Sequence, residues 1–384
     1  MDNIQSIVYK YSSFAENVFR KIDKKMSSVT IRSKNIIADG CDEDGMYRDC
    51  RDISWWTNGF FGGLNLLLYH ETGNRDYLET ALASEKRLDA AFTVGFDELH
   101  HDVGFMWHIL SGANYRINKS SESRIRNLHA AAFLTSRFVV GGNFLEAWNG
   151  PGSENITIID TMMNLPLLYW ASDEIGHDRY RRIAMAHADT AIRTHMRPDG
   201  SIAHIVEHNR ESGDTVRTFG GQGYAEGSAW SRGQAWALYG FTLSYLHTGE
   251  TRYLEAAIRA ADYFISGCSK NWTVPVDFKA PSEPYVIDNS AAACAACGLI
   301  ELGKILASSK GERYIDAAAN LLSVIDAKYA NYSPDTDYLV GYGSVNYPVN
   351  GDFKKAEVHV PIIYADYFYI EAILKLLQSD FNPW

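Results

Sequence analysis

A short pattern that recurs four times constrains the fold of this chain more than any other feature. Each copy consists of the end of one helix, a turn that contains glycine, and a new helix that begins with a polar residue. In the copy YLHTGETRYLEAAIRAADYF, apolar side chains follow at i, i+3, i+4 and i+7, the spacing of one helical face. The other copies are YHETGNRDYLETALA, SDEIGHDRYRRIAMA and LASSKGERYIDAAANLL. The sequence therefore predicts helices packed in hairpins.

The spacing of the four copies argues against an open solenoid, whose repeats keep a constant period. Their tyrosines, Tyr77, Tyr180, Tyr253 and Tyr314, lie 103, 73 and 61 residues apart. Strand alternation is scarce between the copies, and SIAHIVEH is its best candidate. We predict an all-α toroid of helical hairpins with long loops gathered on one rim. Because no linker rich in proline, serine or charge interrupts the chain, residues 1–384 are treated as one domain, with residues 1–50 as an N-terminal helix and loop.

Composition narrows the classes of function. Aromatic residues make up 13% of the chain, which is typical of proteins that stack flat apolar faces, such as those of sugars. The net charge of −11 and the lack of a long basic run predict no nucleic-acid partner. The first residues, MDNIQSIVYKYSSFAENVF, read as neither a secretory signal nor a membrane span. Five scattered cysteines argue against a disulfide framework, so we expect a cytoplasmic protein without a membrane partner.

One acidic residue stands alone in an apolar segment. In NITIIDTMMNLPLLYW, Asp160 is the only charged residue between Glu154 and Asp173. Burial of a carboxyl group is costly unless the group is paired or protonated, and a general acid must carry a proton. The alternative is a helix N-cap, in which Asp160 accepts hydrogen bonds from the backbone of the following helix. Both interpretations stay open on this segment alone.

A second segment, LHHDVGF, places His100, His101 and Asp102 in sequence. Three adjacent titratable groups are compatible with a metal site, an acid–base site or an exposed loop. No HExxH motif, Cys/His cluster or Asp-rich calcium loop accompanies them. We therefore predict no metal at this position.

A third segment, GGQGYAEGSAWSRGQAWALYGF, places Arg232 between Trp230 and Trp236. A guanidinium group binds a carboxylate through two parallel hydrogen bonds, and tryptophan rings can hold the face of a sugar. This arrangement favours an anionic sugar as ligand. A structural alternative is that Arg232 pairs with a core acid beside packed tryptophans.

Several motifs occur in a fixed order from about Trp55 to Leu377: WWTNGF, HHDVGF, EAWNG, DTMMNLPLLYW, GQG, WSRGQAW, DNSAAACAACGL and ADYFYIEA. This ordered set resembles the unsaturated glucuronyl hydrolases, glycoside hydrolase family 88. The resemblance implies a six-hairpin (α/α)6 barrel with its active site in the loops of one rim, which agrees with the recurring hairpins. It implies neither a metal nor an organic cofactor.

The resemblance also implies a substrate and a reaction. Family members remove the 4,5-unsaturated uronic acid from the non-reducing end of lyase-generated oligosaccharides, here of glycosaminoglycan type. The aspartate at the position of Asp160 protonates C4 and then, as a carboxylate, takes a proton from the water that attacks C5. The resulting hemiketal falls apart. Asp102 is implied as the second carboxylate, which influences the protonation of Asp160 because two like charges do not ionise together cheaply.

Further residues are implied as substrate contacts. His101 and Gln222 would hydrogen-bond the uronate, Arg232 would pair with its carboxylate, and the remaining positions would line or close the pocket: Trp56, Trp148, His204, Trp230 and Trp236. Some members that prefer sulfated substrates carry two serines and a lysine near the C-terminal loop. Here GYGSVNYPVNGDFKK supplies Ser344, whereas Tyr347 and Val349 stand at the other two positions. The sequence carries no signal for oligomeric state.

Three other functions remain as alternatives. An unsaturated rhamnogalacturonyl hydrolase shares the barrel and the chemistry but acts on pectin fragments, and the SRGQAW and HHD segments favour the glucuronyl group over it. An α/α-barrel sugar epimerase would depend on histidine bases. An inactive sugar-binding protein is disfavoured because Asp102 and Asp160 are both present.

Overall fold

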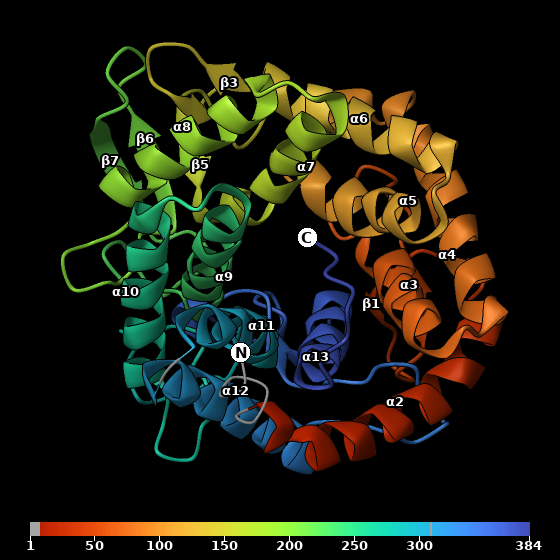
Figure 1. The fold of residues 1–384 in the computed structure, drawn as a ribbon. Helices are drawn as coiled ribbons and strands as arrows, with labels where there is room; N and C mark the ends of the chain where they lie inside the picture. Colours follow the sequence, from red (N-terminus) through yellow and green to blue (C-terminus); the bar gives the residue numbers. More distant parts are fainter. Residues whose placement is uncertain (1–7, 308) are drawn as a thin grey trace.

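The computed structural model describes residues 8–307 and 309–384, which form a closed ring of helices in two layers (Figure 1). The inner layer consists of α3 (Phe60–Thr72), the π-helix η3 (Gly104–Gly112) continued by α5 (Ala113–Asn118), α7 (Leu165–Ile175), α9 (Ser231–Thr248), α11 (Asn289–Leu306) and α13 (Ile363–Leu376). The outer layer consists of α2 (Ser12–Arg32), α4 (Arg75–Leu88), α6 (Ser121–Ser136), α8 (Arg179–Thr194), α10 (Thr251–Gly267) and α12 (Ser309–Lys328). The predicted (α/α)6 barrel is confirmed.

Glycines in the left-handed region end the inner helix in three of the four predicted hairpins. Gly73, Gly176 and Gly249 have φ of 69°, 66° and 72°, which a residue without Cβ adopts at no steric cost. The fourth hairpin differs from the prediction, because Ala307 takes this place with φ of 48°. Gly311, the glycine expected in the turn, lies inside α12, where a Cβ would come within 2.4 Å of the Gly303 carbonyl oxygen. That glycine permits close helix packing instead.

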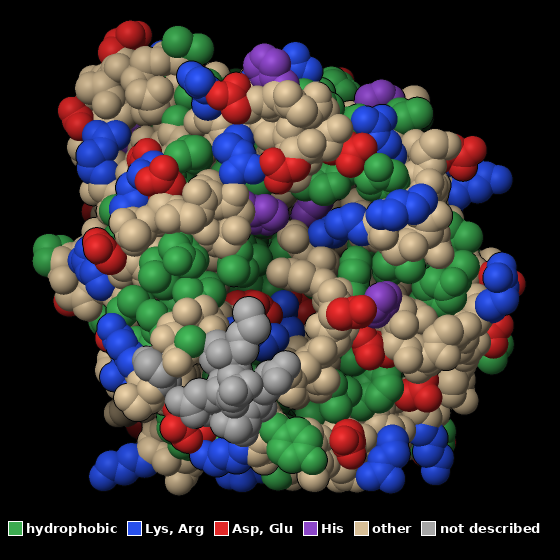
Figure 2. Space-filling model, in the orientation of Figure 1, with side chains coloured by type: hydrophobic (Ala, Val, Ile, Leu, Met, Phe, Trp, Pro, Cys, Tyr) green, Lys and Arg blue, Asp and Glu red, His purple; other side chains and the backbone are tan. Residues whose placement is uncertain are grey.

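The N-terminal and C-terminal helices close the ring, since α2 packs against α13 (Figure 1). This pair is the sixth hairpin, and its two helices come from opposite ends of the chain. The helix α11 is long and apolar enough to cross a membrane by length and composition alone, but 78% of that stretch is buried inside the barrel. Acidic and basic side chains are interspersed over the face seen in Figure 2.

The loops contain short antiparallel strands, and one three-stranded sheet determines the positions of Asp160 and His204. It has the order β5 (Ile156–Ile158), β6 (Ile205–His208), β7 (Thr215–Phe219), so the SIAHIVEH prediction is confirmed in β6. Directly after β5, the backbone N–H of Ile159 donates to the His204 carbonyl oxygen at 3.1 Å. The sheet thereby brings Asp160 next to His204. The two-stranded sheets pair β1 (Ala38–Cys41) with β2 (Tyr47–Asp49), β3 (Phe138–Val139) with β4 (Phe144–Leu145), and β8 (Gly343–Ser344) with β9 (Val358–Val360).

Candidate active site

A cavity of about 1000 Å³ opens among the loops of the barrel. It brings together residues that are far apart in sequence, and six of the predicted site residues line it: Trp56, His101, Asp102, Trp148, Asp160 and Gln222. His204, Trp230, Arg232, Trp236 and Ser344 are not among its lining residues. Six of the predicted site residues therefore form the surface of the cavity, and the other five do not line it.

Asp160 lies in a 3-10 turn, η4 (Ile159–Met163), between β5 and α7. Its side chain caps no helix, so the N-cap interpretation is wrong. Oδ2 has no hydrogen-bond partner among the described residues, and it lies 3.6 Å from Nε2 of His204. Oδ2 is itself buried, so the 13% of the Asp160 side chain that is exposed belongs to the rest of the group, which lines the cavity.

Asp102 is the more deeply buried carboxyl group, with 9% of its side chain exposed. Burial raises the pKa of Asp102 well above its ordinary value, and the charge of Asp160 raises it further. The Asn164 amide, which donates to Asp102 Oδ1 at 2.9 Å, and the charge of Arg137 act in the opposite direction. The sequence had suggested Asp160 as the acid in apolar surroundings, whereas Asp102 is the more deeply buried of the two. The pair is thus set to retain one proton.

Asn164 holds this arrangement in place, and sequence analysis did not assign it a role. Its side-chain oxygen accepts from the Phe105 N–H at 2.9 Å while its amide nitrogen donates to Asp102. The approach is so close that a Cβ on Gly104 would lie 2.6 Å from the Asn164 oxygen. An asparagine in an apolar segment carries no charge, and this is why the sequence did not single it out.

The two histidines beside Asp102 are neutral. Burial lowers the pKa of His100 to about 4 and that of His101 well below its ordinary value. His101 Nδ1 meets the Thr161 hydroxyl at 2.9 Å, and its Nε2 lies 3.3 Å from Asp102 Oδ2. Ligand atoms of His100, His101 and Asp102 converge within 4.8 Å, and no further histidine, cysteine or acid of the described chain joins them. The arrangement provides hydrogen-bonding groups around Asp102.

Hydrogen bonding also fixes the tautomer of His204. The backbone N–H of Gln222 donates to His204 Nδ1 at 3.1 Å, a shorter contact than the 3.4 Å from Nδ1 to the Gly220 carbonyl oxygen, so we assign this nitrogen as an acceptor. In the neutral ring Nε2 then carries the hydrogen, and it lies on the side of Asp160. The ring packs against that of Trp230 in a tilted arrangement, with 4.2 Å between centroids. His204 therefore offers an N–H to the carboxyl group of Asp160 from behind the cavity wall.

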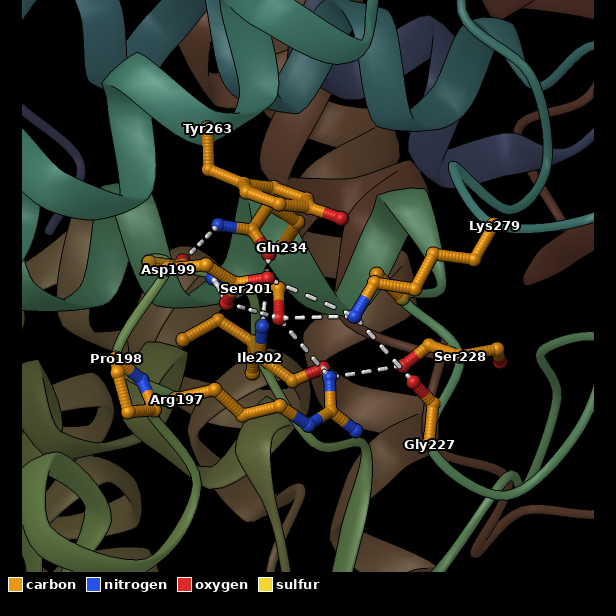
Figure 3. A network of polar contacts seen from close by, with 12 residues as sticks. Arg197, Pro198, Asp199, Ser201, Ile202, Gly227, Ser228, Gln234, Tyr263 and Lys279 are labelled. Carbon is orange, nitrogen blue, oxygen red and sulfur yellow. Dashed lines mark hydrogen bonds and ion pairs between the residues drawn. The ribbon is translucent and has the colours of Figure 1, made fainter.

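A polar network holds the segment that leads into β6 (Figure 3). The Arg197 guanidinium donates to the carbonyl oxygens of Ser228 at 2.9 Å and Ile202 at 3.2 Å. Gln234 on α9 accepts from the Ile202 N–H at 3.0 Å and donates to the Gly200 carbonyl oxygen at 2.9 Å. These bonds tie the chain before His204 to the glycine-rich loop and to an inner helix.

Asp277 anchors the same glycine-rich loop from the other side. This acid is 2% exposed and accepts from the N–H groups of Tyr224 at 3.0 Å and Ala229 at 3.2 Å and from the Ser228 hydroxyl at 2.7 Å. These bonds on both sides of the glycine-rich loop hold the backbone of Gln222 in place. The Gln222 N–H, in turn, determines the tautomer of His204.

Arg232 is buried and paired with a core acid, as the structural alternative expected. Its Nη1 donates to Asp288 Oδ2 at 2.7 Å, and its Nη2 donates to the Val345 carbonyl oxygen at 2.9 Å. The guanidinium also lies 4.4 Å from the Trp230 ring centroid and 5.2 Å from that of Tyr364. Val345 and Tyr364 line the cavity, so Arg232 supports its wall from behind. Its contact with a uronate carboxylate stays a prediction.

Two predicted contacts are placed away from the cavity. Trp236 is fully buried on α9 and packs against Phe105 and Phe368, because an inner helix turns this face to the barrel axis. Ser344 is also fully buried, and its hydroxyl donates to the Ile287 carbonyl oxygen at 2.7 Å. In this structure neither side chain has a surface with which to contact substrate, which corrects the prediction for both.

Trp56 and Trp148 form aromatic walls of the cavity. Trp56 packs on Tyr364 with 5.0 Å between ring centroids, and Tyr364 is a lining residue that sequence reasoning did not name. Trp148 is held by Arg137, whose guanidinium donates to the Trp148 and Glu146 carbonyl oxygens, each at 2.7 Å. Arg137 carried no sequence signal, since it follows a polar helix end without a motif.

A closed ring of six helical hairpins, with two carboxyl groups in an aromatic-lined cavity among its loops, defines a barrel enzyme of the glycoside hydrolase class. The chain is 36% identical over 345 residues to the unsaturated glucuronyl hydrolase of Bacillus sp. (strain GL1), covering 87% of this chain and 89% of that protein. The chain belongs to the unsaturated glucuronyl hydrolase family.

Two further comparisons agree with this assignment. The unsaturated chondroitin disaccharide hydrolase of Streptococcus pyogenes serotype M1 is 32% identical over 339 residues, covering 87% of this chain and 84% of that protein. The crystal structure of the Bacillus sp. GL1 unsaturated glucuronyl hydrolase, described as responsible for the degradation of glycosaminoglycan, superposes with a TM-score of 0.85 at 32% identity, over 93% of this chain and 96% of that one. A search of protein-family profiles finds no match.

Proposed function

We propose that this protein removes the 4,5-unsaturated uronic acid from the non-reducing end of lyase-generated oligosaccharides of glycosaminoglycan type. The observation that carries the proposal is the carboxyl pair: Asp160, which lines the cavity, and Asp102, whose pKa is raised by burial and by its neighbour. The family relationship supports the substrate class, since the similar proteins are named for unsaturated glucuronyl and chondroitin disaccharide substrates.

The reaction is a hydration of the C4=C5 enol ether, with Asp160 as acid and then base. The carboxyl group of Asp160 gives its proton to C4, and the C5 carbon becomes an oxygen-stabilised cation. Water adds to C5 and gives a proton to the Asp160 carboxylate, which restores the acid. The hemiketal then opens: the C5 hydroxyl becomes a ketone, and the ring oxygen leaves C5 with that proton to become a hydroxyl on C1. The resulting hemiacetal at C1 expels the next sugar as an alcohol, and an open-chain keto acid remains.

The neighbouring groups support both halves of this cycle. Burial of Asp102 disfavours two negative charges in the pair, so the pair retains one proton for Asp160 to deliver to C4, and entry of an anionic uronate favours this proton because it adds a negative charge nearby. The His204 N–H lies 3.6 Å from Asp160 Oδ2 and stabilises the carboxylate that forms after proton transfer. Trp56 and Trp148 both line the cavity and can take the apolar faces of the sugars.

An absorbance assay tests the proposal. Unsaturated disaccharides from chondroitin, hyaluronan and heparin should lose the ultraviolet absorbance of their conjugated double bond when the protein is added. The Asp160→Asn variant should abolish this loss, because an amide does not supply the proton. Asp178→Asn is the matched control, since Asp178 is an exposed acid paired with Arg182 outside the cavity. Near-native turnover by Asp160→Asn would place the acid elsewhere.

The same assay separates the alternatives. Activity on unsaturated rhamnogalacturonyl fragments of pectin, without activity on glycosaminoglycan disaccharides, would identify the related pectin hydrolase. Binding of these sugars without any loss of absorbance would identify an inactive sugar-binding protein. Either result contradicts the proposal as stated.

We also propose a cytoplasmic location. The five cysteines, Cys41, Cys50, Cys268, Cys294 and Cys297, are free thiols, and a reducing compartment keeps thiols in that state. Fractionation of the source cells followed by the absorbance assay tests this point. Activity confined to the medium or to a periplasmic fraction would contradict it.

A further inference from the structure

Asn164 connects the two carboxyl groups of the site. It is fully buried between the turn η4, which carries Asp160, and the helix α7. Its side-chain nitrogen donates to Asp102 Oδ1 at 2.9 Å and to the Asp160 backbone oxygen at 3.3 Å, while its oxygen accepts from the Phe105 N–H at 2.9 Å. The reverse assignment would turn the amide oxygen toward two oxygens and the NH₂ group toward an N–H. These contacts therefore settle the orientation of the amide.

The amide of Asn164 treats the two carboxyl groups unequally. It gives Asp102 a hydrogen bond, whereas Asp160 Oδ2 has no donor among the described residues. Nε2 of His204 lies 3.6 Å from Asp160 Oδ2, a weaker contact than a hydrogen bond. A hydrogen bond to a carboxylate stabilises its ionised form. The bond from Asn164 therefore favours a negative charge on Asp102 and leaves the proton of the pair to Asp160.

Burial acts against this distribution of the proton. Asp102 is the more deeply buried of the two groups, and burial and the charge of Asp160 raise its pKa well above its ordinary value. A proton that stayed on Asp102 would leave Asp160 as a carboxylate, which has nothing to give to C4. A hydrogen bond to a charged group shifts an ionisation equilibrium by about tenfold to a hundredfold, which is enough to oppose part of the effect of burial.

The other titratable groups around Asp102 do not donate a hydrogen bond to its carboxyl group. His100 and His101 lie 3.6 and 3.3 Å from Oδ2, and burial lowers the pKa of both, so they are neutral. The charge of Arg137, at the end of α6, acts in the same direction as Asn164. Its guanidinium donates to two carbonyl oxygens and to an asparagine side chain instead. Within the described chain, Asn164 is thus the hydrogen-bond donor to this carboxyl group.

The charged group that faces Asp160 is already balanced by another acid. Arg232 on α9 interacts with Asp160 through its charge, which would favour the ionised form of Asp160. Its guanidinium is paired with Asp288 at 2.7 Å, however, and both side chains are buried. The hydrogen bond from Asn164 is therefore the main contact that distinguishes the two carboxyl groups in favour of a protonated Asp160.

We propose that Asn164 is a positioning residue that directs the proton of the carboxyl pair to Asp160, by donating a hydrogen bond to the ionised form of Asp102. The inference rests on the proposed function, in which Asp160 gives this proton to C4. Asn164 is buried and does not line the cavity, so it acts on the substrate through the carboxyl pair. It determines how much of the enzyme is in the reactive protonation state.

The pH dependence of kcat/KM on an unsaturated disaccharide distinguishes this role from a structural one. Asn164→Leu removes the donor with little change in volume. Because Asp102 then keeps the proton, kcat/KM at the pH optimum should fall about tenfold, and the basic limb should move to higher pH by up to about one unit. Above that limb both carboxyl groups are ionised in either protein, and the affinity of Asp160 for a proton beside an ionised Asp102 does not depend on Asn164. The native and variant rates should therefore converge as the pH rises.

Asn114→Leu is the matched control. Asn114 on α5 is 2% exposed, donates to the buried carboxyl group of Glu85 at 3.0 Å and does not line the cavity. With rates expressed per folded protein, this variant should keep the native kcat/KM across the pH range. A loss in Asn164→Leu by the same factor at every pH would overturn the proposal and leave Asn164 with a structural role only.

Asn164→Asp decides the question if the leucine variant does not fold. Its side chain has the size of asparagine, and its oxygen still accepts from the Phe105 N–H. It replaces the amide that faces Asp102 with a third acidic group, so the cluster should hold its proton to higher pH and the basic limb should move upward. An unmoved limb would overturn the proposal. Failure of the native protein on every unsaturated disaccharide would instead refute the proposed function, and this inference with it.

Discussion

The replacement Asp288→Asn tests whether Arg232 is primarily a structural residue of the cavity wall. Arg232 and Asp288 are 1% and 0% exposed, and their atoms meet at 2.7 Å. Asp288 Oδ1 also accepts from the Ser290 N–H at 2.9 Å and from its hydroxyl at 2.6 Å. An asparagine can keep these two bonds through its oxygen. It then turns an NH₂ group toward the guanidinium, so a donor faces a donor and the buried positive charge loses its partner.

The expected loss of stability follows from that burial. Removal of one partner from a buried ion pair costs about 3–5 kcal/mol, because the remaining charge stays in a medium of low polarity. Arg232 keeps its bonds to the Ser344 and Val345 carbonyl oxygens, at 2.6 and 2.9 Å, so the loss should lie near the lower limit, at about 3 kcal/mol. Typical proteins are stable by about 5–15 kcal/mol, so the variant should fold but unfold at clearly lower urea concentrations.

Equilibrium unfolding in urea, followed by tryptophan fluorescence, measures this loss. Asp189→Asn is the matched control, since Asp189 pairs with Arg252 at the same 2.7 Å while 47% and 41% of the two side chains are exposed. Exposed ion pairs contribute about 0–1 kcal/mol, so this variant should unfold close to the native midpoint. A difference of about 2 kcal/mol or more between the two variants is expected.

Equal stability of the two variants would refute the account of Arg232 as the partner of a core acid. It would mean that the guanidinium is not dependent on Asp288 and is free to bind a substrate carboxylate. Kinetics then decide that role, because a lost uronate contact raises KM, whereas a displaced wall at Val345 lowers kcat and kcat/KM together.

Two further predictions concern protonation. Arg137→Gln should lower kcat/KM and move the basic limb of its pH profile to higher pH, because loss of the positive charge further raises the pKa of Asp102. Arg137→Lys keeps the charge and should restore the position of this limb. An unmoved limb in the glutamine variant would contradict the coupling between Arg137 and Asp102. Burial lowers the pKa of His187 to about 3, and its Nδ1 accepts a hydrogen bond from the Leu145 N–H at 3.0 Å. Between about pH 6.5 and 3, the His187 ring therefore becomes protonated only in the unfolded chain. Stability should fall as pH falls through this range. His187→Gln should therefore lose about 1 kcal/mol less stability than the native protein between pH 6.5 and 5.5 in urea titrations, and parallel losses would rule this histidine out as a source of acid sensitivity.

The parts of the fold that the sequence predicts are those with local signals. A glycine that ends one helix in the left-handed region, followed by a polar start and an apolar stripe, identifies a hairpin without knowledge of its neighbours. The turn between α5 and α6 was not predicted because Lys119 occupies the left-handed position, with φ of 59°. The pairing of α2 with α13 was not predicted as a hairpin because no local signal joins the two ends of a chain.

In the site too, residues with an unusual local sequence were predicted, whereas the direction in which a buried helix points its side chains was not. Asp102 and Asp160 were found because charges in unusual settings stand out in a sequence. Trp236 was misplaced because a motif of two tryptophans around an arginine does not reveal which face of the helix looks at the cavity. An inner helix such as α9 is buried all round, so its hydrophobic pattern carries no information on direction.

Sequence analysis assigned the acid and base tasks mainly to Asp160, whereas in the structure both Asp102 and Asp160 contribute to them. Asp102 lies deeper, is held by Asn164 and has a pKa raised by burial and by the charge of Asp160, so ionisation of both carboxyl groups together is disfavoured and one proton stays in the pair. Asp160 lines the cavity, and its buried Oδ2 lies 3.6 Å from His204 Nε2, which suits a group that gives the proton and then carries the charge. A single carboxyl group in an apolar pocket would hold its proton strongly and accept one back readily, but it would have nothing to stabilise the intermediate carboxylate. The pair, with one buried member and one backed by a neutral histidine, meets both requirements of a hydration in which the same residue is acid and then base.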